Sequence, residues 1–249
     1  MQIVVDSLLT EYARTGDGQP LLVLHGWGDS SKGWREFQKL LAEDYDVIAV
    51  DLPGFGGTQS PPLAWGLDEY ARFVREFLKK IQVKPYAIVA HSNGGAIAIR
   101  GLAEGLLRAD RLVLLDSAGI RDTYRGRTKI IRLITKTGKV LVTPLPGSIK
   151  KKLRRKVYQK VGSDMLVAEH LQETFKNVVT DDVQADAAAL KLPTLLIYGE
   201  DDLATPPRYG RLLQHLIDGS VLEIVPGAGH FVHLDKPTIV LKLVRSFLA

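Results

Sequence analysis

The sequence predicts an α/β fold, with a mostly parallel open sheet, helices on both of its faces and one inserted helical segment. Short apolar runs recur along the 249 residues, and amphipathic stretches with helical spacing lie between them. This alternation stops after residue 118 and resumes near residue 192. The length suits one compact domain with at most a small insertion.

Six apolar runs are expected to form the parallel strands. They are apolar on both faces, as in Val-Ile-Ala-Val at residues 47–50, which is typical of strands that are covered from both sides. The opening residues 3–12 are expected to form an antiparallel strand or hairpin at the edge of the sheet. The six runs are residues 21–25, 47–50, 86–90, 111–115, 194–198 and 221–225.

Apolar residues at helical spacing predict the helices that cover this sheet. One such stripe consists of Trp34, Phe37, Leu40 and Leu41. Strands that alternate with helices in this way indicate a sheet with helices on both faces. The stripes fall within residues 34–41, 70–78, 98–107, 212–216 and 241–247.

The interruption of the pattern predicts a helical cap at residues 119–190, inserted into a core made of residues 1–118 and 191–249. Charge is distributed unevenly between these parts. The chain has a net charge of +5, yet residues 121–160 hold 14 Lys and Arg and a single acid, Asp122. The remaining residues therefore carry −8. The basic character belongs to one segment and indicates a part with a different role.

The basic run at Lys150, Lys151, Lys152, Arg154 and Arg155 has two interpretations. It is either a solvated outer face of the cap or a surface that weakly contacts anionic lipid headgroups or acidic substrates. A nucleic-acid partner is not expected, because the run has few aromatic residues to stack on bases. The oligomeric state is left open.

Composition excludes several classes of protein. The 45% hydrophobic and 24% charged residues are typical of a folded globular protein. Because there is no cysteine, a disulfide framework and a thiolate nucleophile are excluded, and without an HExxH pair no metal site is expected. The apolar runs are too short to span a bilayer, and residues 1–6 do not resemble a signal peptide, so a cytoplasmic location is expected.

The sharpest local motif is Ala-His-Ser-Asn-Gly-Gly at residues 90–95, between a predicted strand and a predicted helix. Small residues at positions 90 and 94 fit a strained turn that raises the Ser92 hydroxyl above the end of the sheet. The same turn places the Asn93 N–H at a helix N-terminus, where it faces a developing oxyanion. The alternative is an ordinary helix start with Ser92 as N-cap.

Other polar residues also follow predicted strands. Asp202 ends the run Gly-Glu-Asp-Asp after residues 194–198, and His230 follows residues 221–225. Ligands of open α/β sheets bind at the carboxyl ends of the strands, where Ser92, Asp202 and His230 would meet. The chain order Ser, Asp, His is the order of one fold in particular.

The sequence resembles the α/β-hydrolase superfamily over essentially its whole length, and most closely the capped serine esterases and C–C bond hydrolases of that superfamily. The resemblance implies Ser92 as nucleophile, Asp202 as the acid and His230 as the base. It also implies the backbone N–H groups of Trp27 and Asn93 as an oxyanion hole, with no cofactor. The matching stretches are residues 25–30, 51–57, 91–95, 199–206 and 227–237.

Several assignments stay open at this stage. Asp201 and Asp116 are alternative acids, and Asp116 follows the predicted strand at residues 111–115. Ser30 and His233 are candidate substrate-binding residues, with His233 expected to pack near the entrance of the site. The expected function is hydrolysis of small to medium carboxylic esters through an acyl-enzyme. The alternatives are a C–C bond hydrolase or lyase of the same fold, or a ligand-binding receptor with weak turnover.

Overall fold

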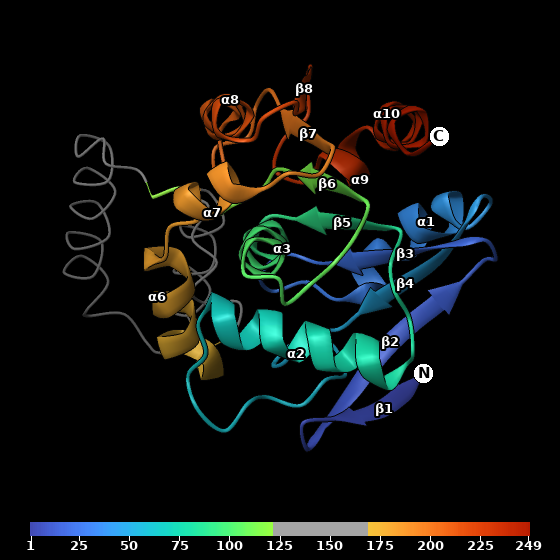
Figure 1. Ribbon diagram of the computed structural model, residues 1–249, viewed down its shortest axis with the longest axis vertical. Helices are drawn as coiled ribbons and strands as arrows, with labels where there is room; N and C mark the ends of the chain where they lie inside the picture. Colours follow the sequence, from blue (N-terminus) through green and yellow to red (C-terminus); the bar gives the residue numbers. More distant parts are fainter. Residues whose placement is uncertain (122–168) are drawn as a thin grey trace, which may run out of the picture.

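The computed structural model describes residues 1–121 and 169–249 and contains one eight-stranded sheet (Figure 1). The strand order is β1-β2-β4-β3-β5-β6-β7-β8. The first two strands run antiparallel at one edge, and the others pair in parallel, which confirms the predicted fold class. The strands are β1 (Gln2–Val5), β2 (Leu8–Thr15), β3 (Gln19–Leu24), β4 (Tyr45–Val50), β5 (Ala87–His91), β6 (Arg111–Leu115), β7 (Thr194–Gly199) and β8 (Val221–Val225).

Helices cover both faces of the sheet, and alternate strand residues pack against each layer (Figure 1). In β3, Leu22 and Leu24 face the layer of α2, α3 and α8, whereas Leu21 and Val23 face α1 and α10. The helices are α1 (Ser31–Leu41), α2 (Leu67–Lys80), α3 (Asn93–Ala103), α6 (Gln172–Thr180), α7 (Gln184–Ala189), α8 (Pro207–Leu216), α9 (Val232–Asp235) and α10 (Pro237–Leu248).

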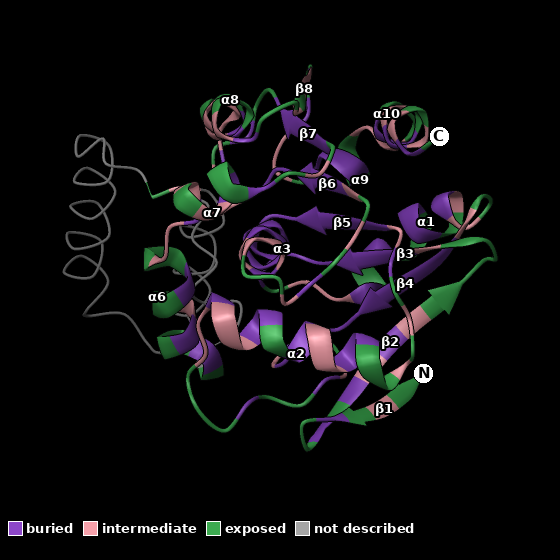
Figure 2. Cartoon of the chain, in the orientation of Figure 1, coloured by how far each residue is buried: buried purple, intermediate pink, exposed green. Residues whose placement is uncertain are grey.

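The central strands are almost entirely buried, as expected from their apolar sequence (Figure 2). The predicted strand at residues 221–225 forms as β8, but the expectation that it is buried on both faces was wrong, because β8 is the last strand of the sheet and is only partly covered. Val221 is 48% exposed, because an edge strand has a neighbour on one side only.

Helix α3 is shorter than the apolar spacing at residues 98–107 predicts. It ends at Ala103, and Gly105 follows with a φ of +68°. This left-handed conformation breaks the helix and is easily adopted by glycine. Leu107 still packs into the core, and its N–H donates to the Gly101 carbonyl at 2.8 Å.

Residues 122–168 lie outside the described residues, and with them most of the predicted cap and the basic run at residues 150–156. The cap boundaries at 119 and 190 and its contact with anionic surfaces therefore stay predictions. From Glu169 onward a short 3₁₀ helix (Glu169–Leu171), α6 and α7 lead back to the sheet. In the ranges that are described, no helix is long and apolar enough to cross a membrane.

Arg100 on α3 ties this returning segment to the core. Its Nε lies 2.8 Å from Asp186 Oδ2 of α7, and its Nη2 lies 3.1 Å from Asp181 Oδ1, just after α6. Its Nη1 pairs with Asp68 of α2. The Arg100 side chain is only 14% exposed, so these charged hydrogen bonds are poorly screened by water.

Replacing Arg100 with methionine is expected to lower the free energy of unfolding by about 2–3 kcal/mol, because three carboxylates lose the cation that they share. The measurement is urea unfolding followed by circular dichroism. Arg72→Met is the matched control, since Arg72 pairs with Glu69 on an exposed helix face and such pairs contribute less than about 1 kcal/mol. Equal losses in both variants would contradict an anchoring role for Arg100.

Candidate active site

Ser92 occupies a strained turn between β5 and α3. Its φ of 49° and ψ of −117° are unusual for a residue other than glycine. The Ser92 N–H donates to the Leu115 carbonyl of β6 at 3.0 Å, which holds the turn at the carboxyl end of the sheet. At Gly94 a Cβ atom would collide with the backbone carbonyls of Leu24 and His25. The motif thus requires glycine at position 94 because α3 passes against the end of β3.

The structure brings Ser92, His230 and Asp202 into one chain of hydrogen bonds. His230 Nε2 lies 3.1 Å from Ser92 Oγ, and His230 Nδ1 lies 2.8 Å from Asp202 Oδ2. Because a carboxylate only accepts, Nδ1 carries the proton and Nε2 is left to accept from the serine hydroxyl. This is the geometry of a nucleophile activated by a base that an acid orients.

Asp202 is held as an ionised carboxylate by its own loop. Oδ1 accepts the backbone N–H groups of Ala204 and Thr205 at 2.7 and 3.0 Å, and the Thr205 hydroxyl lies 2.7 Å from Oδ2. Burial acts to raise the pKa of Asp202, but the hydrogen bond and charge of His230, with the Thr205 bonds, keep it below its ordinary value. The neighbouring Asp201 is exposed, and the carboxylate that faces His230 Nδ1 is that of Asp202.

Asp116, the other alternative acid, joins two loops. It is fully buried with a φ of 46°, and its two oxygens accept the N–H groups of Gly199 and Val232 at 2.8 and 3.0 Å. Burial raises the pKa of Asp116 to about 7, although both N–H bonds oppose this shift. Gly199 begins the turn to Asp202 and Val232 follows His230, so Asp116 connects the loops of Asp202 and His230.

Trp27 and Asn93, the residues expected to form an oxyanion hole, both line the cavity that holds Ser92 and His230. A Cβ at Gly26 would lie 3.1 Å from the Ser92 Cβ, so the loop after β3 passes directly beside the nucleophile. Neither the Trp27 nor the Asn93 backbone N–H donates a hydrogen bond to another described residue. The role of these two donors as an oxyanion hole stays a prediction.

The structure does not bring the two candidate substrate-binding residues to this cavity. Ser30 directly precedes α1, is half-buried and is not among the residues that line the cavity. His233 is fully buried, and its ring stacks on that of Trp34 in α1 with ring centroids 4.3 Å apart. The expectation that His233 packs near the entrance was wrong, because α9 turns its imidazole into the layer of α1 and α10.

The cavity beside Ser92 measures about 200 Å³. Its described walls are mostly apolar and include Ile120, Phe175 and Val178, together with the polar residues Asp181 and Tyr209. Phe175 also contacts the Trp27 ring at a centroid distance of 5.1 Å. Of these residues the sequence pattern indicates only Trp27, because the helical spacing of Phe175, Val178 and Tyr209 does not reveal which side of a helix faces a pocket, and Ile120 and Asp181 lie outside helices.

One group of described residues has the composition of a metal site, namely His91, Asp116 and His230, whose ligand atoms lie within 4.8 Å of one another. Most of their atoms are already engaged, and His91 Nδ1, which has no hydrogen-bond partner, packs against Gly26. Both Asp116 oxygens accept N–H groups, His91 Nε2 binds a carbonyl, and the His230 nitrogens face Ser92 and Asp202. We assign no metal to this group.

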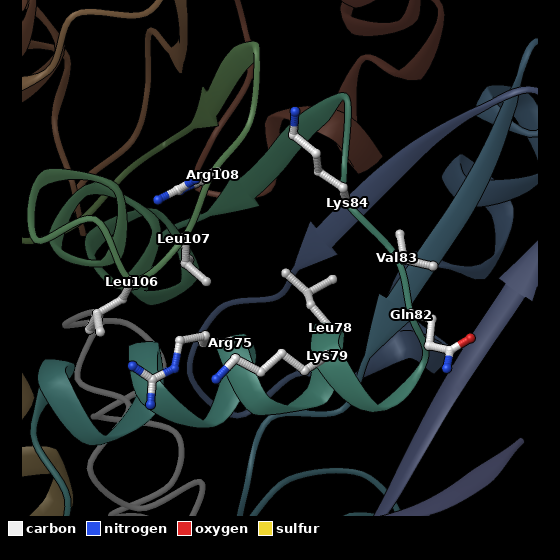
Figure 3. Close-up of a pocket in the computed structure, with 9 residues that line it drawn as sticks. All are labelled: Arg75, Leu78, Lys79, Gln82, Val83, Lys84, Leu106, Leu107 and Arg108. Atoms are coloured by element: carbon white, nitrogen blue, oxygen red, sulfur yellow. The ribbon is translucent and has the colours of Figure 1, made fainter.

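A second hollow, of about 300 Å³, lies between the end of α2 and the segment that leads into β6 (Figure 3). Leu78 and Leu107 point into it, and four cations surround it. Arg75 and Lys79 both pair with Glu76. The described residues that line this hollow include no serine, threonine, carboxylate or histidine, unlike those of the cavity at Ser92.

Comparison with known proteins identifies the family of the chain. Residues 21–243 match the model of the alpha/beta hydrolase family. The chain belongs to this family. Among its hydrolase relatives, the 2-hydroxy-6-oxo-6-(2'-aminophenyl)hexa-2,4-dienoic acid hydrolase of Metapseudomonas resinovorans is 28% identical, over 96% of this chain and 87% of that protein.

Two solved hydrolase structures share the fold. A bacterial membrane phospholipase A superimposes with a TM-score of 0.80 at 23% identity, covering 100% of this chain and 84% of that one. An esterase from Thermogutta terrifontis superimposes with a TM-score of 0.74 at 20% identity, covering 100% and 97%. Because both sequence identities are below 25%, these two superpositions show only that this alpha/beta hydrolase shares the fold.

Proposed function

We propose that this alpha/beta hydrolase cleaves carboxylic esters of small to medium size through an acyl-enzyme on Ser92. The observation that carries the proposal is the hydrogen-bonded series Ser92, His230 and Asp202 at the wall of a mostly apolar cavity. Such a series is the minimum machinery for nucleophilic acyl transfer.

The proposed reaction begins with transfer of the Ser92 proton to His230 Nε2 as Oγ attacks the ester carbonyl. The negative charge that develops on the carbonyl oxygen is stabilised by the N–H groups of Trp27 and Asn93, each contributing roughly 3 kcal/mol. Asp202 keeps the imidazole in the required tautomer and stabilises its charged form. His230 then protonates the leaving alcohol and later activates the water that releases the acid.

The walls of the cavity favour an uncharged substrate near the scissile bond. Among the described residues that line it, none is lysine or arginine, and the charge of Asp181 is already balanced by its ion pair with Arg100. A substrate carboxylate beside Ser92 would therefore lack a cationic partner in this part of the chain. This supports a neutral ester over a dienoate.

A second candidate function is hydrolysis of a C–C bond by the same triad. It is favoured by the relative from Metapseudomonas resinovorans, whose name identifies a 6-oxo-dienoic acid as its substrate. That substrate class carries a carboxylate, and the described walls hold no lysine or arginine to pair with it.

The proposal is tested by fluorophosphonate labelling and by hydrolysis of a series of p-nitrophenyl esters. The series should show rapid release of nitrophenol followed by slower turnover, because the acyl-enzyme accumulates when its hydrolysis is slower than its formation. A 2-hydroxy-6-oxo-dienoate assayed in parallel should be cleaved much more slowly. Preference for the dienoate would identify the second candidate, and labelling without turnover of either substrate would indicate a binding protein.

A further inference from the structure

His91 is the last residue of β5 and immediately precedes Ser92, yet its side chain reaches the loop of the base. It is 1% exposed, and its Nε2 lies 2.7 Å from the backbone carbonyl oxygen of His230. Because a carbonyl only accepts, Nε2 carries the proton. Nδ1 has no hydrogen-bond partner and packs against Gly26, where a Cβ would lie 2.7 Å away.

The surroundings of His91 keep it neutral. Burial lowers the pKa of His91 well below its ordinary value, and the neighbouring imidazoles of His230 and His233 act in the same direction. A neutral imidazole with its proton on Nε2 is a fixed single donor, suited to holding one carbonyl in place.

We propose that His91 is a positioning residue, which donates its Nε2–H to the His230 carbonyl and thereby sets the base against the nucleophile. The proposal rests on the proposed function, because it assigns His91 a part in the reaction of Ser92 with His230. One strand end would then supply both the nucleophile and the tether that brings the base to it.

The need for such a tether follows from the location of His230. It lies after β8, the partly exposed last strand of the sheet, whereas Ser92 follows the buried central strand β5. The working distance between His230 Nε2 and Ser92 Oγ is 3.1 Å, and a displacement of about 1 Å is enough to cost roughly 10²-fold in rate. Asp116 holds the same loop at the Val232 N–H, two residues further on.

His233 provides a matched control in the same cluster. It is also a buried histidine, and its ring centroid lies 5.1 Å from that of His91. Burial lowers the pKa of His233 to about 3, with a smaller contribution from His230. Neither of its ring nitrogens has a hydrogen-bond partner, so it packs in the core without tethering the loop.

The experiment compares His91→Phe, His91→Gln and His233→Phe, with kcat, KM and the rate of fluorophosphonate labelling measured for each. His91→Phe removes the donor and is expected to reduce kcat and the labelling rate by about 10- to 100-fold, with KM nearly unchanged. His91→Gln retains an N–H donor and should recover most of the loss. His233→Phe should stay within about 3-fold of the parent protein, because it removes no hydrogen bond.

Equal losses in His91→Phe and His233→Phe, or no recovery in His91→Gln, would overturn the proposal. Hydrogen exchange at residues 229–232 tests the tether without any substrate, since exchange should accelerate in His91→Phe and not in His233→Phe. If the parent protein neither labels nor hydrolyses esters, the proposed function fails while this exchange result still decides the tether. Should His91→Phe fail to fold, His91→Leu removes the same donor with a smaller side chain.

Discussion

Replacing Ser92 with alanine is expected to reduce ester hydrolysis on the order of 10⁶-fold and to abolish fluorophosphonate labelling. The change removes the Oγ that lies 3.1 Å from His230 Nε2, and no other atom of the turn can form the acyl-enzyme. His230→Ala should be equally damaging, because the hydroxyl then has no acceptor for its proton. The double variant should be no worse than either single one, since members of one catalytic unit are not additive.

The control for this prediction is a measurement of whether the variant keeps its folded stability. Thermal unfolding of Ser92→Ala should match the parent protein, because alanine retains the Cβ and the change removes only the hydroxyl at this turn. Fluorophosphonate labelling of another serine at the parent rate would show that the nucleophile lies elsewhere. A double variant that is far less active than both single variants would separate His230 from the reaction of Ser92.

Replacing Asp202 with asparagine is expected to lower kcat by about 10⁴-fold, the cost of the same substitution in another triad. The amide retains the size of the carboxylate, but its NH₂ group favours the wrong tautomer of His230 and no longer balances the imidazolium charge. The measurement is steady-state hydrolysis of an activated ester across pH.

Asp201→Asn and Asp116→Asn are the matched controls for this change. Asp201 is exposed, so its variant should resemble the parent protein. At Asp116 an amide can accept only one of the two N–H groups, from Gly199 and Val232, so the variant should lose about 1–3 kcal/mol of stability. Its loss of kcat should stay far below that of Asp202→Asn. Near-normal activity of Asp202→Asn would transfer the acid role to another carboxylate.

Much of the fold could be predicted because the spacing of apolar residues along the chain indicates most of its strands and helices. Runs apolar on both faces correspond to β3 to β7, and helical stripes correspond to α1, α2, α8 and α10. Errors occurred where the local pattern ends. The apolar spacing continues to Leu107 although the chain leaves the helix near Gly105, and the apolar run of β8 does not reveal that this strand is last in the sheet.

The site was predictable to the extent that its residues follow strand ends. Parallel strands bring their carboxyl ends to one edge, so Ser92, Asp202 and His230 could be placed near one another from the order of the elements. The burial of His233 was not predictable, because the short helix α9 decides its direction. The walls at Phe175 and Val178 were not predictable either, because they come from a helix whose packing partner is distant in sequence.

The sequence by itself determined the parallel sheet, its two helical layers and the turn that carries Ser92, because apolar periodicity and small residues act over a few neighbouring positions. Tertiary structure alone decided that Asp202 rather than Asp201 or Asp116 reaches His230, and that His91 contacts the loop of the base. His91 and His230 are 139 residues apart in the chain. Contacts of this kind depend on how loops after different strands turn toward one another, which no local pattern encodes.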